Sequence, residues 1–519
     1  MTKWISTAMR AVTCGAVLAL AVAPAGLSAQ RGSGASSGGA PEDLRGDEDG
    51  HSGRFGRMFR LTPFAEPTPA VSAALVRLGA RGGLLDARDQ LSAGPLALIV
   101  DPLLNLNNPN NDTETAGMTF LGQFLDHDMT FDTGSRLGKP TNPHRSVNAR
   151  RPFFDLDSVY GDGPAGSPHL FETADHAKLR VESGGLFEDL PREASGRAVV
   201  ADPRNDENIV LAGLQAAMLL THNRAVDQVR LAEPSLDTEA VFVEARRQVT
   251  WHYQWIILHE FLPQVAGPAL VERLLTEGPR HYRPKQDNAF IPVEFQIAYR
   301  MGHSMVRPSY RANFTSNGGA PLFAFVFDPS QEGAAAPTDM RGGVRGVNRF
   351  VGWSTFFRFP GLEGDVRPNK RLDTRLSTPL FDLPLGAIAA GTPPTSLAER
   401  NLLRHLTWMV PSGQAIAAKL GVPALSKAQL SELAAIHPSF VSSTPLWYYV
   451  LKEAEVVEQG LRLGPVGARL VAEVFIGLLQ SDSDSYLHAD TPFVPSFGAN
   501  PGAFTMVDLL NFAGVGGRR

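Results

Sequence analysis

A histidine stands between two carboxylates in the stretch AGMTFLGQFLDHDMTFD, which covers residues 116–132. Its apolar residues recur at helical spacing, so His127 shares a helix face with Gln123, four residues earlier. Asp126 lies three residues after Gln123, whereas Asp128 is turned about 100° further round the helix and can serve another side. A neutral histidine in such a place can accept and return protons. For this stretch alone, a structural histidine at a solvated helix end is the competing interpretation.

The stretch VVADPRNDENIVLAGLQ places a cation and a carboxylate ahead of a long apolar run. Asp202-Pro203 predicts the start of a helix, with Arg204 in the first turn and Glu207 three residues later on the same side. A cation in the first turn opposes the helix dipole, so helix stability does not favour Arg204 there. An exposed Arg–Glu pair contributes little to stability. The apolar run that follows makes burial of this pair the alternative.

Two further stretches carry groups that could line a pocket. In FQIAYRMGHSMVRPSY, His303 lies on a predicted amphipathic helix beside Gly302, which lets a bulky group approach the backbone. In SLAERNLLRHLTWMVPSGQ, Asn401 and Arg404 are three residues apart and could face the same pocket. Taken alone, a histidine such as His303 is more often structural than a ligand.

A fifth stretch, ARRPFFDLDSVYGDG, holds Asp155 and Asp157 two residues apart in a predicted loop. Hard oxygen atoms at alternate positions suit Ca²⁺, which takes six to eight oxygen ligands. Asp128 would supply a further carboxylate. Because a lone Asp-x-Asp is commonly only a turn, this calcium prediction depends on the other four stretches.

Several other chemistries are excluded by composition and spacing. His259-Glu260 begins like a zinc-protease motif, but Pro263 stands where the second histidine is needed. The only cysteine is Cys14, in the N-terminal segment, so thiolate ligands and disulfides are excluded from the predicted mature chain. The formal net charge of -5 and the absence of a long basic run make nucleic acid an unexpected partner.

The N-terminal segment predicts export. Lys3 and Arg10 precede an apolar stretch that ends in small residues, which is typical of a signal peptide over residues 1–29. We therefore expect a secreted or periplasmic protein with no membrane span in the mature chain. Residues 30–57 are rich in Gly, Ser and charge and are predicted to be disordered.

The chain from residue 58 to 519 predicts one domain of the mainly α class. Apolar residues recur at helical spacing in SAALVRLGA, AVFVEARRQVTWHYQWIILHEFL, ARLVAEVFIGLLQ and the stretches above. Strand-like alternation is scarce, and many of the 39 prolines and 50 glycines lie in the connections. We expect a single large helical domain with long irregular connections and little β-structure.

Taken together and in order, GQFLDHD, FFDLDSVYG, PRNDEN, YRMGHS and RNLLR resemble the motifs of the animal-type haem peroxidases. This family includes myeloperoxidase, lactoperoxidase and bacterial relatives, and it belongs to the peroxidase–cyclooxygenase superfamily. The resemblance runs from about residue 58 to residue 515. It implies a haem b enclosed by a mostly helical fold, with a calcium ion beside it.

The resemblance also implies a role for each matching position. His127 matches the distal histidine, Gln123 its neighbour, and Arg204 the distal arginine. His303 matches the axial ligand of the haem iron, with Asn401 hydrogen-bonded to its other ring nitrogen. Asp126 and Glu207 match carboxylates that form esters with haem, and Arg300 and Arg404 match arginines near the haem propionates. The calcium ligands match Asp128, Arg151, Phe153, Asp155 and Asp157.

These matches imply an enzyme that reduces hydrogen peroxide and oxidises a small donor, with halide, thiocyanate and phenols all open. A fatty-acid dioxygenase is the first alternative, but such enzymes need a tyrosine where this chain has Arg300, and Tyr299 is one residue out of place. A non-catalytic binding protein is the second, and it would not need His127 or His303. The oligomeric state stays open.

Three departures limit the resemblance. Asn208 stands where some members have a methionine bonded to haem, so that bond is excluded here. Arg151 replaces a hydroxyl residue and can offer calcium only its carbonyl, and Asp157 replaces another hydroxyl and adds a charge. Whether Asp126 and Glu207 form esters with haem is left open by the sequence.

Overall fold

Helices dominate the computed structural model, which describes residues 53–517 except 184–186, 315–319, 335–336, 345–347 and 389–390. The strands are short and the sheets small, so the predicted mainly α fold is confirmed. The predicted signal peptide and most of the predicted disordered segment lie outside the described residues. None of the helices in the described part of the chain combines the length and apolar character needed to cross a bilayer.

The prediction of disorder is wrong for residues 53–57, because Gly53–Gly56 forms strand β1. This strand pairs with Val147–Asn148 (β3) on one side and with Ile291–Pro292 (β6) on the other. Phe55 is fully buried, and its ring lies 5.2 Å from that of Trp408. One aromatic side chain and two neighbouring strands therefore order a segment whose composition favours disorder.

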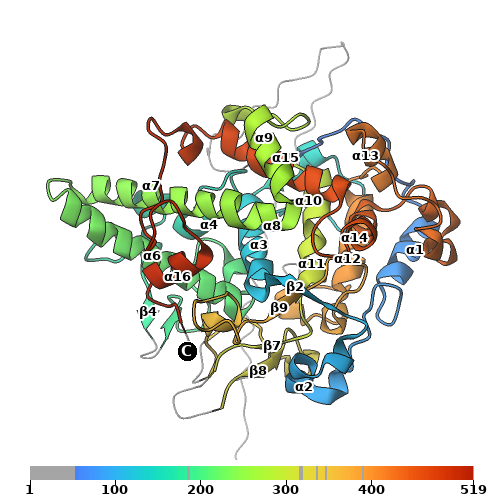
Figure 1. The fold of residues 1–519 in the computed structure, drawn as a ribbon, viewed down its shortest axis with the longest axis horizontal. Helices are drawn as coiled ribbons and strands as arrows, with labels where there is room; N and C mark the ends of the chain where they lie inside the picture. The colour runs from blue at the N-terminus through green and yellow to red at the C-terminus, as the bar shows by residue number, and fades with distance from the viewer. Residues whose placement is uncertain are drawn as a thin grey trace, which may run out of the picture. The chain divides into compact units, whose positions relative to one another are not determined.

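Helix α3 (Ala116–Met129) lies in the middle of the fold (Figure 1). Eleven of its 14 residues are buried, and the exceptions are Gly122, Gln123 and Asp126. A helix that is apolar on nearly all sides must be surrounded by other elements. Gln123 and Asp126 remain partly accessible although the helix lies inside the fold, whereas Gly122 lies close to the ring of Phe261.

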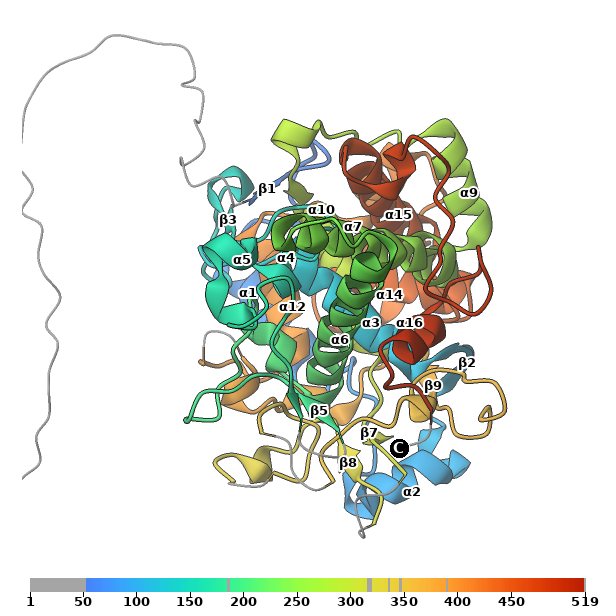
Figure 2. The ribbon, with the colours of Figure 1, turned by 90° about the vertical axis from the view of Figure 1, so that its left-hand side faces the viewer.

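Two long helices, α6 (Ile209–Ala232) and α7 (Thr238–Ile256), pack against each other, and α6 also contacts α3 (Figures 1 and 2). The segment after α7 continues through a π-helical turn at Ile257–Phe261 into α8 (Leu262–Ala266). The predicted helix start at Asp202-Pro203 is wrong for α6. Pro203–Asp206 forms a separate 3₁₀ turn, and α6 begins after Asn208, whose side chain accepts from the backbone N–H groups of residues 210 and 211.

The second half of the site comes from helices later in the chain. The predicted amphipathic helix around His303 is broken into α10 (Val293–Ala298), a 3₁₀ turn at Tyr299–Met301 and the short α11 (Gly302–Met305). Ser304 donates its hydroxyl to the backbone carbonyls of Arg371 and Asp373, which hold α11 in place. Helix α10 packs against α12 (Leu397–Thr407), α14 (Leu446–Val457) and α15 (Pro465–Ser481).

The remaining elements complete the frame. Further helices are α1 (Pro69–Gly79), α2 (Gly94–Val100), α4 (Asp157–Tyr160), α5 (Gly163–Gly166), α9 (Pro268–Glu277), α13 (Gly413–Leu420) and α16 (Met506–Phe512). Three two-stranded sheets pair β2 (Asn110–Thr115) with β9 (Pro368–Lys370), β4 (Glu182–Ser183) with β5 (Glu188–Asp189), and β7 (Ser309–Arg311) with β8 (Phe323–Phe325).

Helix α12 is fixed to α14 by His405, which is fully buried. Its Nε2 accepts the backbone N–H of Trp447 at 3.0 Å, and its Nδ1 donates to the Leu402 carbonyl at 3.0 Å. Trp447 in turn donates its indole N–H to the carbonyl of Arg300 at 3.1 Å. Burial lowers the pKa of His405 to about 4, so the neutral ring holds these contacts.

We predict that His405 makes the folded state sensitive to acid. The pKa of His405 is lower in the folded than in the unfolded chain, so its contribution is complete above about pH 6.5 and is lost as the pH falls toward 4. The loss should reach about 3 kcal/mol of unfolding free energy. In denaturant titrations, His405→Gln should be less stable than wild type at pH 7 but should lose less stability between pH 6.5 and 4. Equal losses in the two proteins would contradict the assignment.

Candidate active site

His127 is buried on α3, and the surroundings keep it neutral. Its ring is 4% exposed. Burial, reinforced by the positive charge of Arg204, lowers the pKa of His127 to about 3. Its Nδ1 lies 2.9 Å from Oδ1 of Asn205, and its Nε2 lies 3.9 Å from Oε2 of Glu207. A neutral imidazole has one N–H and one bare nitrogen, so its neighbours decide which nitrogen can take up a proton.

Asn205 settles that question, and sequence reasoning missed it. Its Nδ2 donates to Oε1 of Gln215 at 2.9 Å and faces the backbone carbonyl of Ser158 at 3.5 Å. The amide oxygen must therefore face His127, where it accepts the Nδ1 proton. Nε2 is left as the bare, basic nitrogen. The only sequence signal was the position of Asn205, next to Arg204 in PRNDEN.

Arg204 lies beside His127, but most of its donors are engaged. Its Nε and Nη2 donate to Asp202, at 3.0 Å and 2.7 Å, and Nη2 also donates to the carbonyls of His127 and Thr130. The guanidinium lies 4.2 Å from the ring centre of Phe131. Asp202 is completely buried, and the facing arginines hold the pKa of its carboxyl below the ordinary value despite burial. The pair therefore places a fixed positive charge next to His127.

Two carboxyl groups flank this face of α3. Glu207 accepts from the side-chain amide of Gln123 at 3.0 Å, and Gln123 accepts from Asn208 at 3.3 Å. Burial raises the pKa of Glu207 to about 7, against the pull of Arg204. Burial also raises the pKa of Asp126, against Arg204 and Arg300. Both residues remain partly accessible, and the positive charge of Arg204 acts on the pKa of each carboxyl.

His303 carries the opposite half of the site. Its Nδ1 lies 2.7 Å from Nδ2 of Asn401, the residue that the resemblance implies as its partner. Burial, with the charge of Arg300, lowers the pKa of His303 to about 3. Arg300 donates to Oδ1 of Asn401 at 3.3 Å. Metal binding through Nε2 requires Nδ1 to keep its proton, so a half-turn of the Asn401 amide, placing Oδ1 against Nδ1, is the arrangement a bound metal needs.

Electrostatic contacts show that the two halves face each other. Burial raises the pKa of Asp126 on α3, and Arg300, three residues before His303, opposes that shift. Burial lowers the pKa of Arg300 to about 10, and Asp126 opposes this second shift. Helices α3 and α11 are neighbours. Arg404 lies at the edge, where it donates to Asp132 at 2.6 Å. The residues of both halves that remain partly accessible are Gln123, Asp126, Arg204, Glu207, Arg300, His303 and Arg404.

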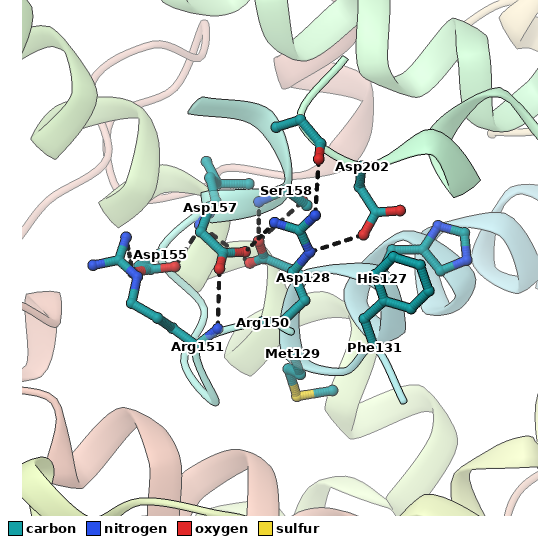
Figure 3. Close-up of polar contacts among 12 residues, drawn as sticks. His127, Asp128, Met129, Phe131, Arg150, Arg151, Asp155, Asp157, Ser158 and Asp202 are labelled. Carbon is teal, nitrogen blue, oxygen red and sulfur yellow. Dashed lines mark hydrogen bonds and ion pairs between the residues drawn. The ribbon is translucent and has the colours of Figure 1, made fainter. Parts of the chain in front are cut away.

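The carboxylate of Asp128 points to the side of α3 opposite the His127 ring (Figure 3). It meets Asp155 and Asp157, and one oxygen from each of the three lies within 4.8 Å of the others. Burial, and repulsion from the other two carboxylates, raise the pKa of Asp128 well above its usual value and that of Asp157 to about 7. The prediction that Asp128 faces a different task from His127 therefore agrees with the geometry.

The aspartate cluster fits a hard cation. Oδ1 of Asp157 is buried and accepts no hydrogen bond from a described residue, although Arg150 lies 3.6 Å away. An unsatisfied carboxylate oxygen among three like charges is the donor set that Ca²⁺ prefers. The guanidinium of Arg151 pairs with Asp155 at 2.7 Å, and its carbonyl accepts from the N–H of Phe153. The carbonyls of Arg151 and Phe153 stay predicted ligands.

Residues 132–338 match the family model of animal haem peroxidase. Thyroid peroxidase of Canis lupus familiaris is 28% identical over 206 residues, which cover 35% of this chain and 22% of that protein. Chorion peroxidase of Drosophila melanogaster is 37% identical over 123 residues, which cover 22% and 15%. The chain therefore matches less than a quarter of the length of either relative.

Two solved structures share the fold over most of the chain. Peroxidase A from Dictyostelium discoideum has a TM-score of 0.57 at 16% identity and covers 90% of this chain and 95% of its own. Fatty acid alpha-dioxygenase of Oryza sativa has a TM-score of 0.56 at 15% identity, with 90% and 80% covered. At these identities the two likenesses show the fold alone. Over residues 132–338, the chain is similar in sequence to the animal haem peroxidases.

The family match includes Arg204, Glu207, Arg300 and His303 but begins after His127. The place of His127 in the site thus rests on its own contacts. These residues fit a haem group. His303 has an Nε2 that no described residue engages, and the arginines and carboxyls of both halves remain partly accessible.

We predict that Asn205→Leu lowers the rate of reaction with hydrogen peroxide by about 10- to 100-fold, because Nδ1 loses the acceptor that keeps Nε2 bare. Stopped-flow absorbance of the haem-loaded protein would measure this. Asn369→Leu is the matched control, since Asn369 is also buried and hydrogen-bonded but lies apart from His127. Equal rates for Asn205→Leu and Asn369→Leu would remove Asn205 from the site.

We also predict that the aspartate cluster binds calcium. Chelation should lower the melting temperature by several degrees and added Ca²⁺ should restore it, because a ligand bound only to the folded state stabilises it. Asp157→Asn should abolish this response. Asp373→Asn is the control, since Asp373 is buried with a pKa of about 7 but lies outside the cluster. A response that survives Asp157→Asn would place the cation elsewhere.

Proposed function

We propose that this protein is a haem peroxidase, which reduces hydrogen peroxide and oxidises a small donor such as a halide, thiocyanate or a phenol. The observation that carries the proposal is the state of His127. The ring is neutral, its Nδ1–H donates a hydrogen bond to Oδ1 of Asn205, and its unprotonated Nε2 faces Glu207. That is the arrangement a general base needs.

His127 would act twice in one turnover. Nε2 first accepts a proton from the near oxygen of hydrogen peroxide, the one that stays behind when the O–O bond breaks. It then returns that proton to the distant oxygen, which leaves as water when the O–O bond breaks. A histidine with an ordinary pKa would be protonated in mildly acidic solution and could not begin this cycle. The lowered pKa of His127 keeps it ready for the first step.

Arg204 would stabilise the negative charge that develops on the departing oxygen. A fixed positive charge in a site shielded from water can contribute about 3 kcal/mol to such a step. Asp202 holds the guanidinium in place through two hydrogen bonds. Arg204 keeps its positive charge despite burial, because the carboxyl groups of Asp202, Asp126 and Glu207 raise its pKa. The guanidinium therefore needs little reorganisation during the reaction.

His303 would hold haem b through Nε2, and Asn401, after the half-turn of its amide, would accept the Nδ1 proton through Oδ1. When bound, the haem iron supplies the electrons that cleave the O–O bond. Arg300 and Arg404 would pair with the propionates, and Asp126 and Glu207 are the carboxyls for ester bonds to haem. Asn208 instead caps α6 and donates to Gln123, which gives its side chain a structural task.

A fatty-acid dioxygenase is the second candidate, because such enzymes share the fold. That reaction needs a tyrosine beside the haem to carry a radical. Tyr299 is 6% exposed and donates its hydroxyl to the carbonyl of Gly122 at 3.0 Å, whereas Arg300 occupies the partly accessible position. The placement of these two residues favours the peroxidase. Export remains a prediction from residues 1–29.

The test is the rate of reaction with hydrogen peroxide after His127→Ala. We expect a loss of about 10²- to 10⁴-fold with haem still bound, because the general base is gone. His222→Ala is the matched control, since His222 is also buried and neutral but bonds Tyr160 and the carbonyl of Ala177. Unchanged peroxide kinetics in His127→Ala, or oxygen uptake with a fatty acid in place of peroxide turnover, would refute the proposal.

A further inference from the structure

Arg150 joins the aspartate cluster to the carboxylate that holds Arg204 (Figure 3). Its Nη1 lies 3.6 Å from Oδ1 of Asp157, and its Nε donates to Oδ2 of Asp202 at 2.9 Å. Its Nη2 donates to the carbonyl of Ala201 at 2.8 Å. The side chain is 11% exposed, so these contacts are shielded from solvent.

One oxygen atom is shared at the next contact. Oδ2 of Asp202 accepts both from Nε of Arg150 and from Nη2 of Arg204, at 2.9 Å and 2.7 Å. Two guanidinium groups that share one acceptor compete for it. If Arg150 moves closer to Oδ2, Arg204 loses part of its hold on that atom, and the reverse also follows.

The remaining contacts of Arg204 lie at the end of α3. Its Nη2 donates to the carbonyls of His127 and Thr130, at 3.1 Å and 2.6 Å. The same nitrogen therefore touches the shared oxygen of Asp202 and the backbone of the residue that we propose as the general base. A small change at Asp202 changes where the guanidinium lies relative to His127.

We propose that Arg150 is a positioning residue that couples cation binding at Asp128, Asp155 and Asp157 to the position of Arg204. The consequence for catalysis rests on the proposed function, whereas the coupling itself does not. The coupling is carried by two oxygens, Oδ1 of Asp157 and Oδ2 of Asp202, which Arg150 bridges.

The direction of the effect follows from charge. A Ca²⁺ ion held by Oδ1 of Asp157 repels Arg150 and takes over the oxygen that it faces. Arg150 then moves closer to Asp202, and Arg204 is released from Oδ2 toward the carboxyl groups of Asp126 and Glu207, which attract its charge. Conversely, removing the Arg204 guanidinium leaves Oδ2 entirely to Arg150, which draws Arg150 away from Asp157. Calcium then meets less competition.

Calcium affinity tests the coupling without reference to turnover. Isothermal titration with CaCl₂ would compare wild type, Arg150→Met, Arg204→Leu and the double variant, all haem-loaded. Because linkage is reciprocal, Arg204→Leu should tighten calcium binding by about fivefold or more, although Arg204 touches none of the three aspartates. In the Arg150→Met background, the same change should have no effect, since the bridge is gone.

Arg151→Met is the matched control. Arg151 is the neighbouring arginine and pairs with Asp155 at 2.7 Å, and none of its contacts in the described chain reaches Asp202. Its loss should change calcium affinity by charge alone, and the Arg204→Leu effect should persist in its presence. If Arg204→Leu fails to fold by circular dichroism, Arg204→Lys replaces it, since a lysine keeps the charge but cannot hold the two-pronged contact with Asp202.

Two results would overturn the coupling: equal effects of the Arg204 change with and without Arg150, or no calcium binding at all. The outcomes also separate it from the proposed function. If the protein turns over peroxide and the Arg150 and Arg204 changes have additive effects on calcium binding free energy, the coupling is refuted and the proposed peroxidase function is retained. Non-additive calcium affinities in a protein that ignores peroxide would do the opposite.

Discussion

The burial of α3, in which eleven of 14 residues are buried, is the constraint on which the rest of the structure depends. A polar side chain on a buried helix must find a specific partner, because water cannot satisfy it. His127 is hydrogen-bonded to Asn205, Asp128 to Ser158 and Tyr253, and Gln123 to Glu207. The partners come from three separate segments, which hold Ser158, Asn205 with Glu207, and Tyr253, so each of these segments must pack beside α3.

The two sides of α3 solve opposite electrostatic problems. On one side, burial and the charge of Arg204 keep His127 neutral, which gives it a nitrogen able to accept protons. On the other side, three carboxylates approach one another, and their mutual repulsion is relieved by a cation or by proton uptake. Asp202 and Arg150 lie between the two sides of α3. A change of charge at the aspartate cluster is therefore felt at Arg204, and the reverse also follows.

Much of the site was predictable from local spacing, and the rest required tertiary contacts. Helical periodicity placed Gln123 and His127 on one face and Asp128 on another, because a helix fixes those angles. The contacts of Asn205 with His127 and of Arg150 with Asp202 could not be assigned from spacing, since they join residues 78 and 52 positions apart in the chain. The ordered strand at Gly53–Gly56 and the break before His303 were missed for the same reason: distant backbone partners override local composition and periodicity.

The central claim is that His127 and His303 enclose a haem that reacts with peroxide. The most direct measurement is the absorption spectrum of the purified haem-loaded protein, before and after one equivalent of hydrogen peroxide, followed by iodide or a phenol. A Soret band that shifts with peroxide and returns with the donor is the predicted result. A protein that acquires no Soret band when haem is abundant, or whose band ignores peroxide, would contradict the account.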